Sequence, residues 1–223
     1  SNFKSKGLDG AFFGSFTYVL AHARMGLNVI ARPENTKGVS CYHGMIFVRK
    51  DSKIRNAKDM KGKRLACVDK ATTAGFLLPM AYFHENGIDD CRKYLKEIYF
   101  TGTHEDVILD VLNRKADIGA AKNTIFERVM REHKPRGKEL LVIDKSPEVP
   151  ENGLAVRKDL DPSLKKKLKD ALLTMHDDRE GMYILVNFGA RRFIETTDSD
   201  YEPVVRYATA AGLNLLTYDY MND

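Results

Sequence analysis

Strand-like and helix-like segments alternate along the chain from Lys61 onward. Four short apolar runs have the character of strands, and three segments with apolar residues at helical spacing lie between them. The expected strands are residues 64–68, 94–100, 116–121 and 139–144, and the expected helices are residues 75–86, 104–113 and 124–132. This alternation with short loops is typical of βαβ units around a mostly parallel sheet.

Further elements flank this block on both sides. We expect strands at 8–13, 28–32 and 44–49 and a helix at 16–24 before it, then a strand at 154–157 and helices at 162–175, 180–187 and 202–211 after it. An α/β block inserted between two crossing segments predicts two lobes, one formed by residues 1–51 and 149–223 and the other by residues 52–148. Lobes joined in this way can hinge, and the cleft between them is the natural ligand site.

The turn Thr72-Thr73-Ala74-Gly75 follows the first strand of the inserted block and opens its first helix. A turn of this kind presents unpaired backbone N–H groups, two hydroxyls and the positive end of a helix dipole at one point. That combination suits a tetrahedral oxyanion. The alternative is an ordinary helix cap, because Ser and Thr are preferred there for purely structural reasons.

Composition fits an ordinary globular chain. Its 223 residues are 43% hydrophobic, which is enough to bury a sizeable core. Lys and Arg number 36 against 31 Asp and Glu, a net charge of +5 that is spread along the sequence. The densest basic run, Lys165-Lys166-Lys167, lies on an amphipathic helix and is expected to be a solvated face, so we predict no nucleic-acid partner.

Cysteine usage and hydropathy exclude several other classes. Cys41, Cys67 and Cys91 have no CxxC spacing, so the sequence indicates neither a structural zinc site nor a disulfide scaffold. No apolar run approaches the roughly 18 residues that cross a bilayer, and no signal peptide opens the chain.

Six motifs in a fixed order carry a family resemblance. They are residues 8–14, 42–52, 69–79, 102–105, 113–120 and 146–150. In this order and at this spacing they resemble the phosphonate/phosphite/phosphate-binding periplasmic components of ABC transporters, from about Lys4 to about Pro162. The resemblance implies an α/β fold of the type II periplasmic binding-protein class, with two Rossmann-like lobes that are joined by two crossing strands and close on a tetrahedral oxyanion.

The resemblance also implies a set of ligand-binding residues. In the family a Ser-Thr-Ser-Gly turn cups the phosphonate oxygens, and here Thr72 to Gly75 match it with one hydroxyl fewer. His104 matches a histidine that donates to the same oxyanion, and Tyr42 matches a tyrosine on the crossing segment. Without the resemblance, His104 would be interpreted as a surface histidine at a helix start, and Tyr42 as a half-buried residue that packs against its neighbours. The full expected set is Ser15, Tyr42, Thr72, Thr73, Ala74, Gly75, His104, Asn123 and Asn152, with no catalytic residue, metal or cofactor.

The sequence departs from the family pattern in two places, and these departures restrict the expected ligand and the expected first lobe. Members that take aminoethylphosphonate hold its ammonium with two carboxylates, and the matching positions here are Thr124 and Asn152. An ammonium in a closed cleft without a carboxylate is poorly compensated, so we do not expect this ligand unless Glu148 or Glu151 substitutes. Family members also open with a strand, a helix and a second strand before the segment that matches Leu8. The chain is therefore either a fragment or has an incomplete first lobe, which would expose sheet edge and core and favour self-association.

The leading interpretation is an extracytoplasmic, membrane-associated binding module for a phosphate-like oxyanion that feeds an ABC transporter permease. One alternative is the ligand-binding input domain of a membrane receptor such as a histidine kinase. A second is an enzyme that uses Cys67 or Cys41 activated by His104 or His43. A third is a vestigial site, or one that holds a sulfur oxyanion or a small organic acid.

Overall fold

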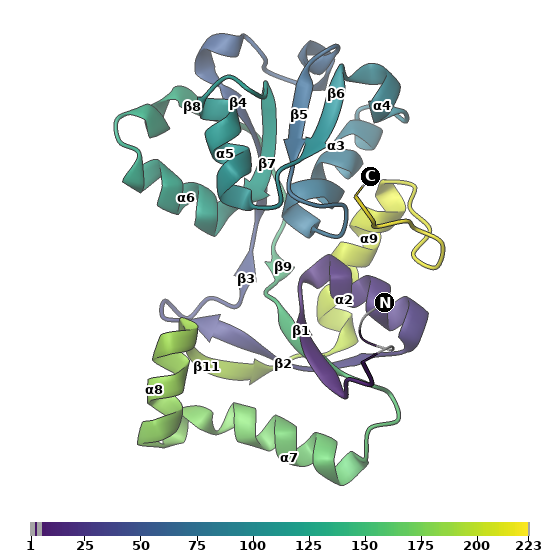
Figure 1. Ribbon diagram of the computed structural model, residues 1–223, viewed down its shortest axis with the longest axis vertical. Coiled ribbons are helices and arrows are strands. Elements are labelled where there is room, and N and C mark those ends of the chain that lie inside the picture. Colours follow the sequence, from purple (N-terminus) through teal and green to yellow (C-terminus); the bar gives the residue numbers. More distant parts are fainter. Residues whose placement is uncertain (1–2, 4–5, 223) are drawn as a thin grey trace. The chain divides into compact units, whose positions relative to one another are not determined.

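The computed structural model describes residue 3 and residues 6–222 and divides into two compact units (Figure 1). Unit 1 consists of Ser1–Cys41 and Val149–Val204, and unit 2 consists of Tyr42–Glu148 and Val205–Asp223. The sequence placed residues 42–51 and 205–223 in the first lobe, whereas contacts group both segments with unit 2. Residues 1–2, 4–5 and 223 of the predicted lobes lie outside the described residues.

Unit 2 is built on a five-stranded sheet with the order β6-β5-β7-β4-β8. Its strands are β4 (Gly44–Arg49), β5 (Arg64–Cys67), β6 (Glu97–Phe100), β7 (Ile118–Lys122) and β8 (Leu140–Lys145). β5 runs parallel to β6 and β7, while β4 is antiparallel to both β7 and β8. The predicted parallel block is present, and β4 enters it from the earlier part of the chain. This pairing is why residues 44–49 belong to unit 2.

Helices cover both faces of this sheet (Figure 1). They are α3 (Leu78–Glu85), the single turn α4 (Cys91–Tyr94), α5 (His104–Leu112) and α6 (Asn123–Glu132). Successive side chains of a strand point to opposite faces, and β4 shows this directly. Phe47 packs with the apolar stripe of α5 and with α6, whereas Ile46 and Val48 pack with α3. All three side chains are fully buried, so β4 is a central strand.

Unit 1 has a four-stranded sheet with the order β1-β10-β2-β11. Its strands are β1 (Gly10–Phe13), β2 (Asn28–Asn35), β10 (Gly153–Val156) and β11 (Ala190–Glu195), and its helices are α2 (Ser15–Met25), α7 (Pro162–Leu173) and α8 (Arg179–Phe188). Every pairing in this sheet is antiparallel: β10 runs antiparallel to both β1 and β2, and β11 runs antiparallel to β2. The pattern differs from the Rossmann-like arrangement expected for the first lobe.

β11 is the strand that the sequence failed to indicate. It contains Arg191, Arg192 and Glu195, and its buried residues are Ala190 and Phe193. The register with β2 shifts between Ala190 and Arg192, which breaks the alternation of apolar and polar residues that reveals a strand.

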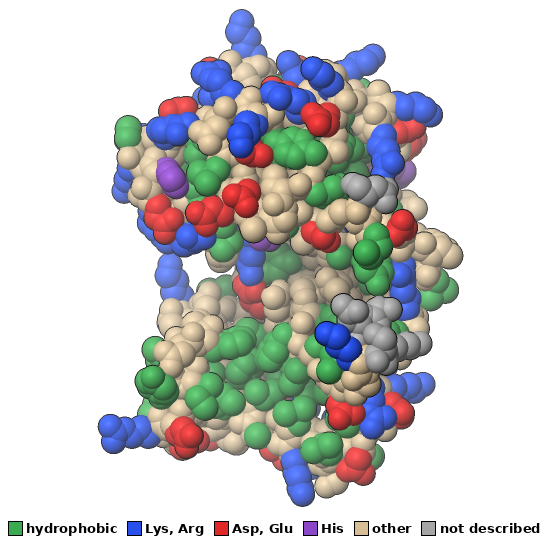
Figure 2. All heavy atoms as spheres, in the orientation of Figure 1, with side chains coloured by type: hydrophobic (Ala, Val, Ile, Leu, Met, Phe, Trp, Pro, Cys, Tyr) green, Lys and Arg blue, Asp and Glu red, His purple; other side chains and the backbone are tan. Residues whose placement is uncertain are grey.

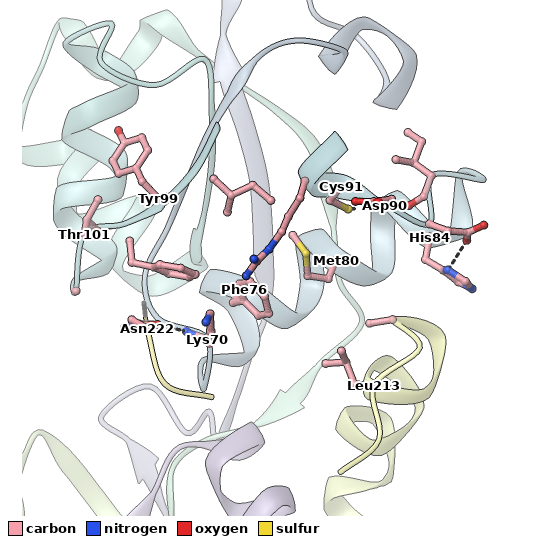
Figure 3. A pocket seen from close by; sticks show the side chains of 17 residues that line it. Lys70, Phe76, Met80, His84, Asp90, Cys91, Tyr99, Thr101, Leu213 and Asn222 are labelled. Atoms are coloured by element: carbon pink, nitrogen blue, oxygen red, sulfur yellow. Dashed lines mark hydrogen bonds and ion pairs between the residues drawn. The ribbon is translucent and has the colours of Figure 1, made fainter. Parts of the chain in front are cut away.

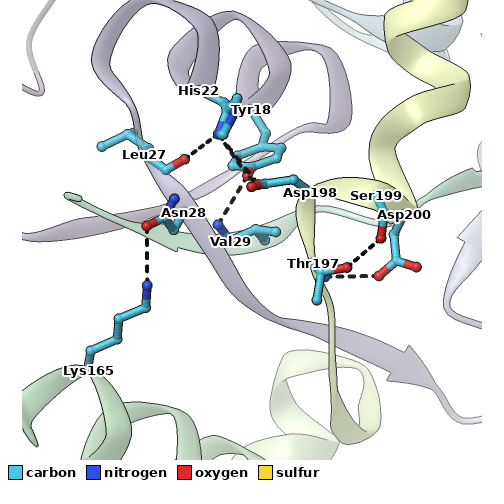
Figure 4. A network of polar contacts seen from close by, with 10 residues as sticks. All are labelled: Tyr18, His22, Leu27, Asn28, Val29, Lys165, Thr197, Asp198, Ser199 and Asp200. Carbon is cyan, nitrogen blue, oxygen red and sulfur yellow. Dashed lines mark hydrogen bonds and ion pairs between the residues drawn. The ribbon is translucent and has the colours of Figure 1, made fainter. Parts of the chain in front are cut away.

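A polar network around Tyr18 fixes α2 to its surroundings in unit 1 (Figure 4). The ring of Tyr18 is buried, and its hydroxyl accepts from the backbone N–H of Val29 (3.2 Å) and donates to the carboxylate of Asp198. The Nδ1 of His22, one turn later on α2, lies 2.7 Å from the carbonyl oxygen of Leu27. The network therefore joins α2, β2 and the segment that precedes α9 (Glu202–Ala210).

Unit 1 also carries apolar side chains on its surface. Figure 2 shows them gathered over the strands of unit 1 and beside α8. Phe12, Phe188 and Phe193 form a cluster with ring centroids 5.5 to 5.9 Å apart, and both Phe12 and Phe188 are about half exposed. An exposed apolar surface was expected from the sequence, and an apolar cluster of this kind is a place where another surface can pack.

The chain passes between the units at two short strands, β3 (Cys41–Tyr42) and β9 (Val149–Pro150), which pair with each other, and again within α9. The segment after α9 packs on unit 2. The hydroxyl of Tyr218 donates to the carbonyl of Lys70 (2.9 Å), and the Lys70 ammonium donates to the carbonyl of Met221. Asn222 accepts from the Lys70 N–H (3.1 Å) and donates to Asp69 (2.6 Å). These bonds explain why residues 205–223 belong to unit 2.

Candidate anion-binding site

The turn after β5 is shaped by Asp69. Its side chain accepts from the N–H of Ala71 (2.7 Å), which forms an Asx-turn, and its carbonyl accepts from both the N–H and the hydroxyl of Thr72 (3.0 and 2.6 Å). The N–H of Val68 bonds to the carbonyl of Gly75 (3.1 Å), which holds the end of the strand against the start of the helix. The position of the predicted anion turn is thus set by local hydrogen bonds.

A π-helical turn, Thr73–Leu77, follows and continues into α3. Its first hydrogen bond joins the N–H of Leu77 to the carbonyl of Thr72 (3.0 Å). The backbone N–H groups of Ala74, Gly75 and Phe76 lie earlier in the turn, where an N–H has no acceptor within the helix. Successive amides at a helix start make an anion-binding concavity to which the helix dipole adds positive potential. The turn therefore has the donors that a phosphonyl or phosphoryl group requires.

Glycine is required at two places around this turn. A Cβ on Gly75 would lie 2.4 Å from Cγ2 of Val68 and 2.8 Å from Oγ1 of Thr72. A Cβ on Gly44, at the start of β4, would lie 2.5 Å from Leu78 and 3.2 Å from the Cα of Ala74. The backbone of β4 thus packs directly against the turn, which leaves no room for a side chain at either glycine.

His104 is the first residue of α5, after the N-cap Thr103. Its Nδ1 accepts a hydrogen bond from the backbone N–H of Lys122 (3.3 Å). In the neutral imidazole the other nitrogen, Nε2, must then carry the hydrogen and act as a donor. Burial, and then the charge of Lys122, lowers the pKa of His104 to about 4. His104 is therefore a neutral donor at the pH of ordinary buffers.

Tyr42 and Asn123 lie at the same edge of the unit 2 sheet. Tyr42 is buried, and the ammonium of Lys122 lies 4.4 Å from the centre of its ring. Asn123, the first residue of α6, exchanges two bonds with the backbone of His43: its side-chain oxygen accepts from the His43 N–H and its own N–H donates to the His43 carbonyl (both 2.9 Å). Asn123 therefore joins β7 to the segment between β3 and β4.

Ser15 and Asn152 belong to unit 1. Ser15 opens α2, is almost fully buried, and donates its hydroxyl hydrogen to the carbonyl of Pro150. Asn152 is exposed between β9 and β10, and its side-chain oxygen lies 3.7 Å from the position of a Cβ on Gly14. The structure brings these two residues near each other at the start of α2, and brings the other seven predicted site residues to one edge of the sheet in unit 2.

The described part of unit 2 includes two hollows near the carboxyl ends of its strands. A cavity of about 930 Å³ is lined mainly by apolar side chains of the segment that includes α3, of β6 and of the chain after α9, among them Phe76, Met80 and Leu213 (Figure 3). The second, of about 520 Å³, opens where β5 and β6 end, and His104 lines it together with Val68 and Gly102. In open α/β sheets ligands bind outside the carboxyl ends of the strands. The second hollow lies at such an end and contains His104, whereas none of Thr72, Thr73, Ala74 and Gly75 lines either hollow.

Lys122 is a residue of this region that the sequence pattern did not indicate as part of the site. It ends β7, precedes α6 and lies near both Tyr42 and His104. A lysine at the end of a strand is usually a solvated surface residue, so the sequence gives little reason to single it out. The signal that was available is its position at the carboxyl end of a strand parallel to β5, the edge where the anion turn also lies.

Cys67 and Cys91 do not have the surroundings of nucleophiles. Cys67 is fully buried in β5, and burial raises the pKa of its thiol. Burial also raises the pKa of Cys91, to about 11. A reactive cysteine needs a lowered pKa and access to solvent, and neither thiol has them.

Comparison with known proteins decides the family. Residues 1–201 match the sequence profile of the ABC transporter phosphonate, periplasmic substrate-binding proteins. The chain belongs to this periplasmic phosphonate-binding family. The match extends past Pro162, where the resemblance expected from the sequence motifs ends.

Relatives agree with this assignment. The chain is 28% identical to the phosphonates-binding periplasmic protein of Escherichia coli over 90% of its own length and 60% of the relative's. It is 33% identical to a phosphate-import protein of Mycolicibacterium smegmatis over 55% of its own length and 41% of the relative's. The chain thus spans about three fifths or less of the length of these two relatives.

A solved structure shows the same fold. The binding-protein component of an ABC phosphonate transporter from Pseudomonas aeruginosa superposes with a TM-score of 0.78 at 24% sequence identity, covering 95% of this chain and 71% of that one. The predicted type II periplasmic binding-protein fold is confirmed. Among the described residues no helix is long and apolar enough to span a bilayer, and no group of three or more His, Cys, Asp or Glu side chains is placed to hold a metal ion.

Proposed function

We propose that this chain binds a phosphate-like oxyanion, namely a phosphonate, phosphite or phosphate, and presents it to the membrane permease of an ABC transporter. The observation that carries the proposal is the turn at Thr73, where the amides of Ala74, Gly75 and Phe76 precede the first bond of the helix. The names of its relatives, a phosphonate-binding and a phosphate-import protein, support the same ligand class.

The remaining donors come from the same unit. The amides of the turn supply N–H groups for the ligand oxygens, and the Thr73 hydroxyl supplies a further donor. His104 adds the N–H of its Nε2, because its Nδ1 is occupied by the backbone of Lys122. These donors replace the hydration shell of the anion, which is how a binding protein selects a small oxyanion without performing chemistry on it. Tyr42, Asn123, Ser15 and Asn152 complete the proposed ligand-binding set.

We propose the permease of an ABC transporter as the partner and the periplasm as the location. Members of the family are periplasmic components of transporters, so the natural place of this chain is outside the cytoplasmic membrane, next to a permease. The two relatives compared above are named as binding or import proteins, which favours transport over a role as the input domain of a receptor. The buried, raised-pKa thiol of Cys67 argues against an enzyme.

The test is a ligand screen on the chain as it stands. A ligand that binds only the folded state must raise the melting temperature, so thermal shifts with phosphate, phosphite, methylphosphonate, sulfate and 2-aminoethylphosphonate rank the candidates. Titration calorimetry then measures the affinity of each hit. Binding of one of the first three supports the proposal, preference for sulfate redirects it to sulfur oxyanions, and the absence of any binding refutes it.

A further inference from the structure

The larger hollow of unit 2 has the size of a ligand-binding cavity. Its volume of about 930 Å³ is within the range of small-molecule pockets, which are mostly apolar and contain a few placed polar groups. Phe76, Met80 and Leu213 line it (Figure 3), whereas none of residues 72–75 does. The cavity is therefore a candidate site for a second ligand, separate from the proposed oxyanion.

Aromatic and sulfur-containing side chains form part of the cavity wall. The rings of Phe76 and Phe100 have their centroids 5.8 Å apart and their planes tilted by 42°. Both rings and the side chain of Met80 pack against the core of unit 2 and remain only partly buried. Aromatic rings and thioethers make favourable contacts with a further ring. This wall therefore suits a planar aromatic group.

The wall made by the chain after α9 is held by hydrogen bonds. Asn222, which lines the cavity, accepts from the Lys70 N–H (3.1 Å) and donates to Asp69 (2.6 Å). The ring of Tyr218 has its centroid 6.5 Å from that of Phe76, and its hydroxyl donates to the Lys70 carbonyl (2.9 Å). Small-molecule sites are usually formed before the ligand arrives, and these contacts give the cavity a formed wall.

Arg92 supplies a positive charge to the lining. The carboxylate of Asp89 lies 2.8 Å from Nδ1 of His84 (Figure 3), and that of Asp90 pairs with Lys93 (2.9 Å). Arg92 is exposed and lines the cavity, and its guanidinium has no hydrogen bond or ion pair to any residue that the structure describes. A guanidinium binds a carboxylate through two parallel hydrogen bonds and also stacks on aromatic faces. The lining thus combines a flat apolar wall with a cation that can bind an anionic group.

We propose that this cavity is a second binding site and that it takes an aromatic carboxylate, with the ring system against the apolar wall and the carboxylate at Arg92. The inference does not depend on the proposed function, because no residue of the anion turn lines the cavity. Burial of the rings supplies most of the affinity, and the ion pair with an exposed arginine supplies the preference for an anion. The ammonium of Lys70, 6.0 Å from the centre of the Phe100 ring, adds positive potential to the same wall.

The experiment compares an aromatic anion with its uncharged analogue. Calorimetry measures the affinities of 2-naphthoate and 2-naphthamide, and of octanoate as an aliphatic anion, for the unmodified chain and its variants. Arg92→Met removes the charge and Arg92→Lys keeps it. Arg131→Met is the matched control, because Arg131 is an exposed arginine of the same unit that does not line the cavity.

A second pair of variants tests the cavity itself. Leu213→Trp places a larger side chain in the lining, and Leu216→Trp is its control, because Leu216 is 65% exposed in the same segment and does not line the cavity. Circular dichroism and the melting temperature show whether each variant is folded.

The unmodified chain is expected to bind 2-naphthoate more tightly than 2-naphthamide or octanoate. Arg92→Met should weaken 2-naphthoate by about twofold to fivefold, the range for an exposed ion pair, and should leave 2-naphthamide unchanged. Arg92→Lys should keep most of the preference for the anion. Leu213→Trp should weaken both naphthalene compounds by about tenfold or more, and the two control variants should change neither affinity.

Four results would overturn the inference. They are no binding of either naphthalene compound, octanoate binding as tight as that of 2-naphthoate, an unchanged ratio of the 2-naphthoate and 2-naphthamide affinities in Arg92→Met, and competitive displacement of 2-naphthoate by methylphosphonate. The last result would place the aromatic ligand in the oxyanion site. Should Leu213→Trp fail to fold, the Arg92 variants decide by the ratio of the two affinities. The oxyanion screen decides the proposed function separately.

Discussion

The backbone N–H of Lys122 donates to Nδ1 of His104 across 3.3 Å and so fixes which imidazole nitrogen carries the hydrogen. The bond joins the end of β7 to the start of α5, and His104 lines the hollow at the carboxyl edge of the sheet. It makes Nε2 the donor and leaves His104 uncharged. A backbone amide can only donate, so protonation of Nδ1 would break the bond.

His104 should therefore make the folding stability depend on pH. Its pKa is about 4 in the folded protein against 6.5 for an ordinary histidine, so the unfolded state binds a proton first as the pH falls. Its stabilising contribution is complete above pH 6.5 and is lost between pH 6.5 and pH 4, by at most ~1.4 kcal/mol per pH unit. Urea unfolding across this range measures the loss.

The variant for this test is His104→Asn, whose side-chain oxygen keeps an acceptor near the Lys122 N–H but does not titrate. The stability of the unmodified chain relative to this variant should fall as the pH drops through the window. His84→Gln, which removes a half-exposed histidine of the same unit, is the control. A difference between the unmodified chain and His104→Asn that stays constant with pH would contradict the neutral, buried state of His104.

Gly75→Ala should destabilise unit 2. The new Cβ would overlap Cγ2 of Val68 at 2.4 Å and Oγ1 of Thr72 at 2.8 Å, and the strand end and the turn would have to separate. Overpacking of this kind costs about 1–3 kcal/mol. Gly14→Ala is the matched control, because its Cβ has nothing closer than 3.7 Å, and we expect it to cost less than about 1 kcal/mol from the cap position. Equal losses of unfolding free energy in the two variants would show that the close approach at Gly75 is relaxed in solution.

How far the sequence predicts this structure is clearest for β4. Its run of Ile46, Phe47 and Val48 identifies the strand with its correct ends, because residues buried on both faces form a continuous apolar stretch. The pattern says that the strand is central, but it does not say to which sheet it belongs. Its pairing with β7 and β8 depends on contacts far apart in the chain, and local patterns do not contain them.

Part of the candidate site can likewise be predicted from local sequence, and part depends on contacts far apart in the chain. The turn at Thr73 and the helix start at His104 are local features, and residue type alone indicates both. The position of Lys122 beside Tyr42 requires β7 to lie next to β4, so it depends on sheet order. The five-residue π-helical turn is also invisible to a search at 3.6-residue spacing, which joins it to α3.

Thr73→Ala should weaken the binding of the oxyanion without unfolding the chain. The residue is nearly buried at the first position of the π-helical turn, where its hydroxyl and the neighbouring amides serve the proposed ligand. Loss of a hydrogen bond to a charged group costs about 1–3 kcal/mol. Calorimetry with the best ligand of the screen measures this change, and Thr209→Ala on α9, where the hydroxyl bonds to the Val205 carbonyl, is the control. An affinity that is unchanged in Thr73→Ala and in His104→Ala would remove this edge of the sheet as the binding site.

Tyr18→Phe should lower the stability of unit 1 although it removes a single oxygen. The phenylalanine keeps the contact with the ring of Tyr201, whose centroid is 4.7 Å away, so apolar packing is preserved. The N–H of Val29 loses its acceptor and the carboxylate of Asp198 loses a donor, and unpaired polar groups of this kind cost about 1–3 kcal/mol. Tyr183→Phe, at a ring that is 70% exposed, should change the unfolding free energy by less than about 0.5 kcal/mol. If denaturant unfolding gave the same value for both variants, the hydroxyl of Tyr18 would not stabilise the junction of α2 and β2, and its ring packing alone would hold that junction.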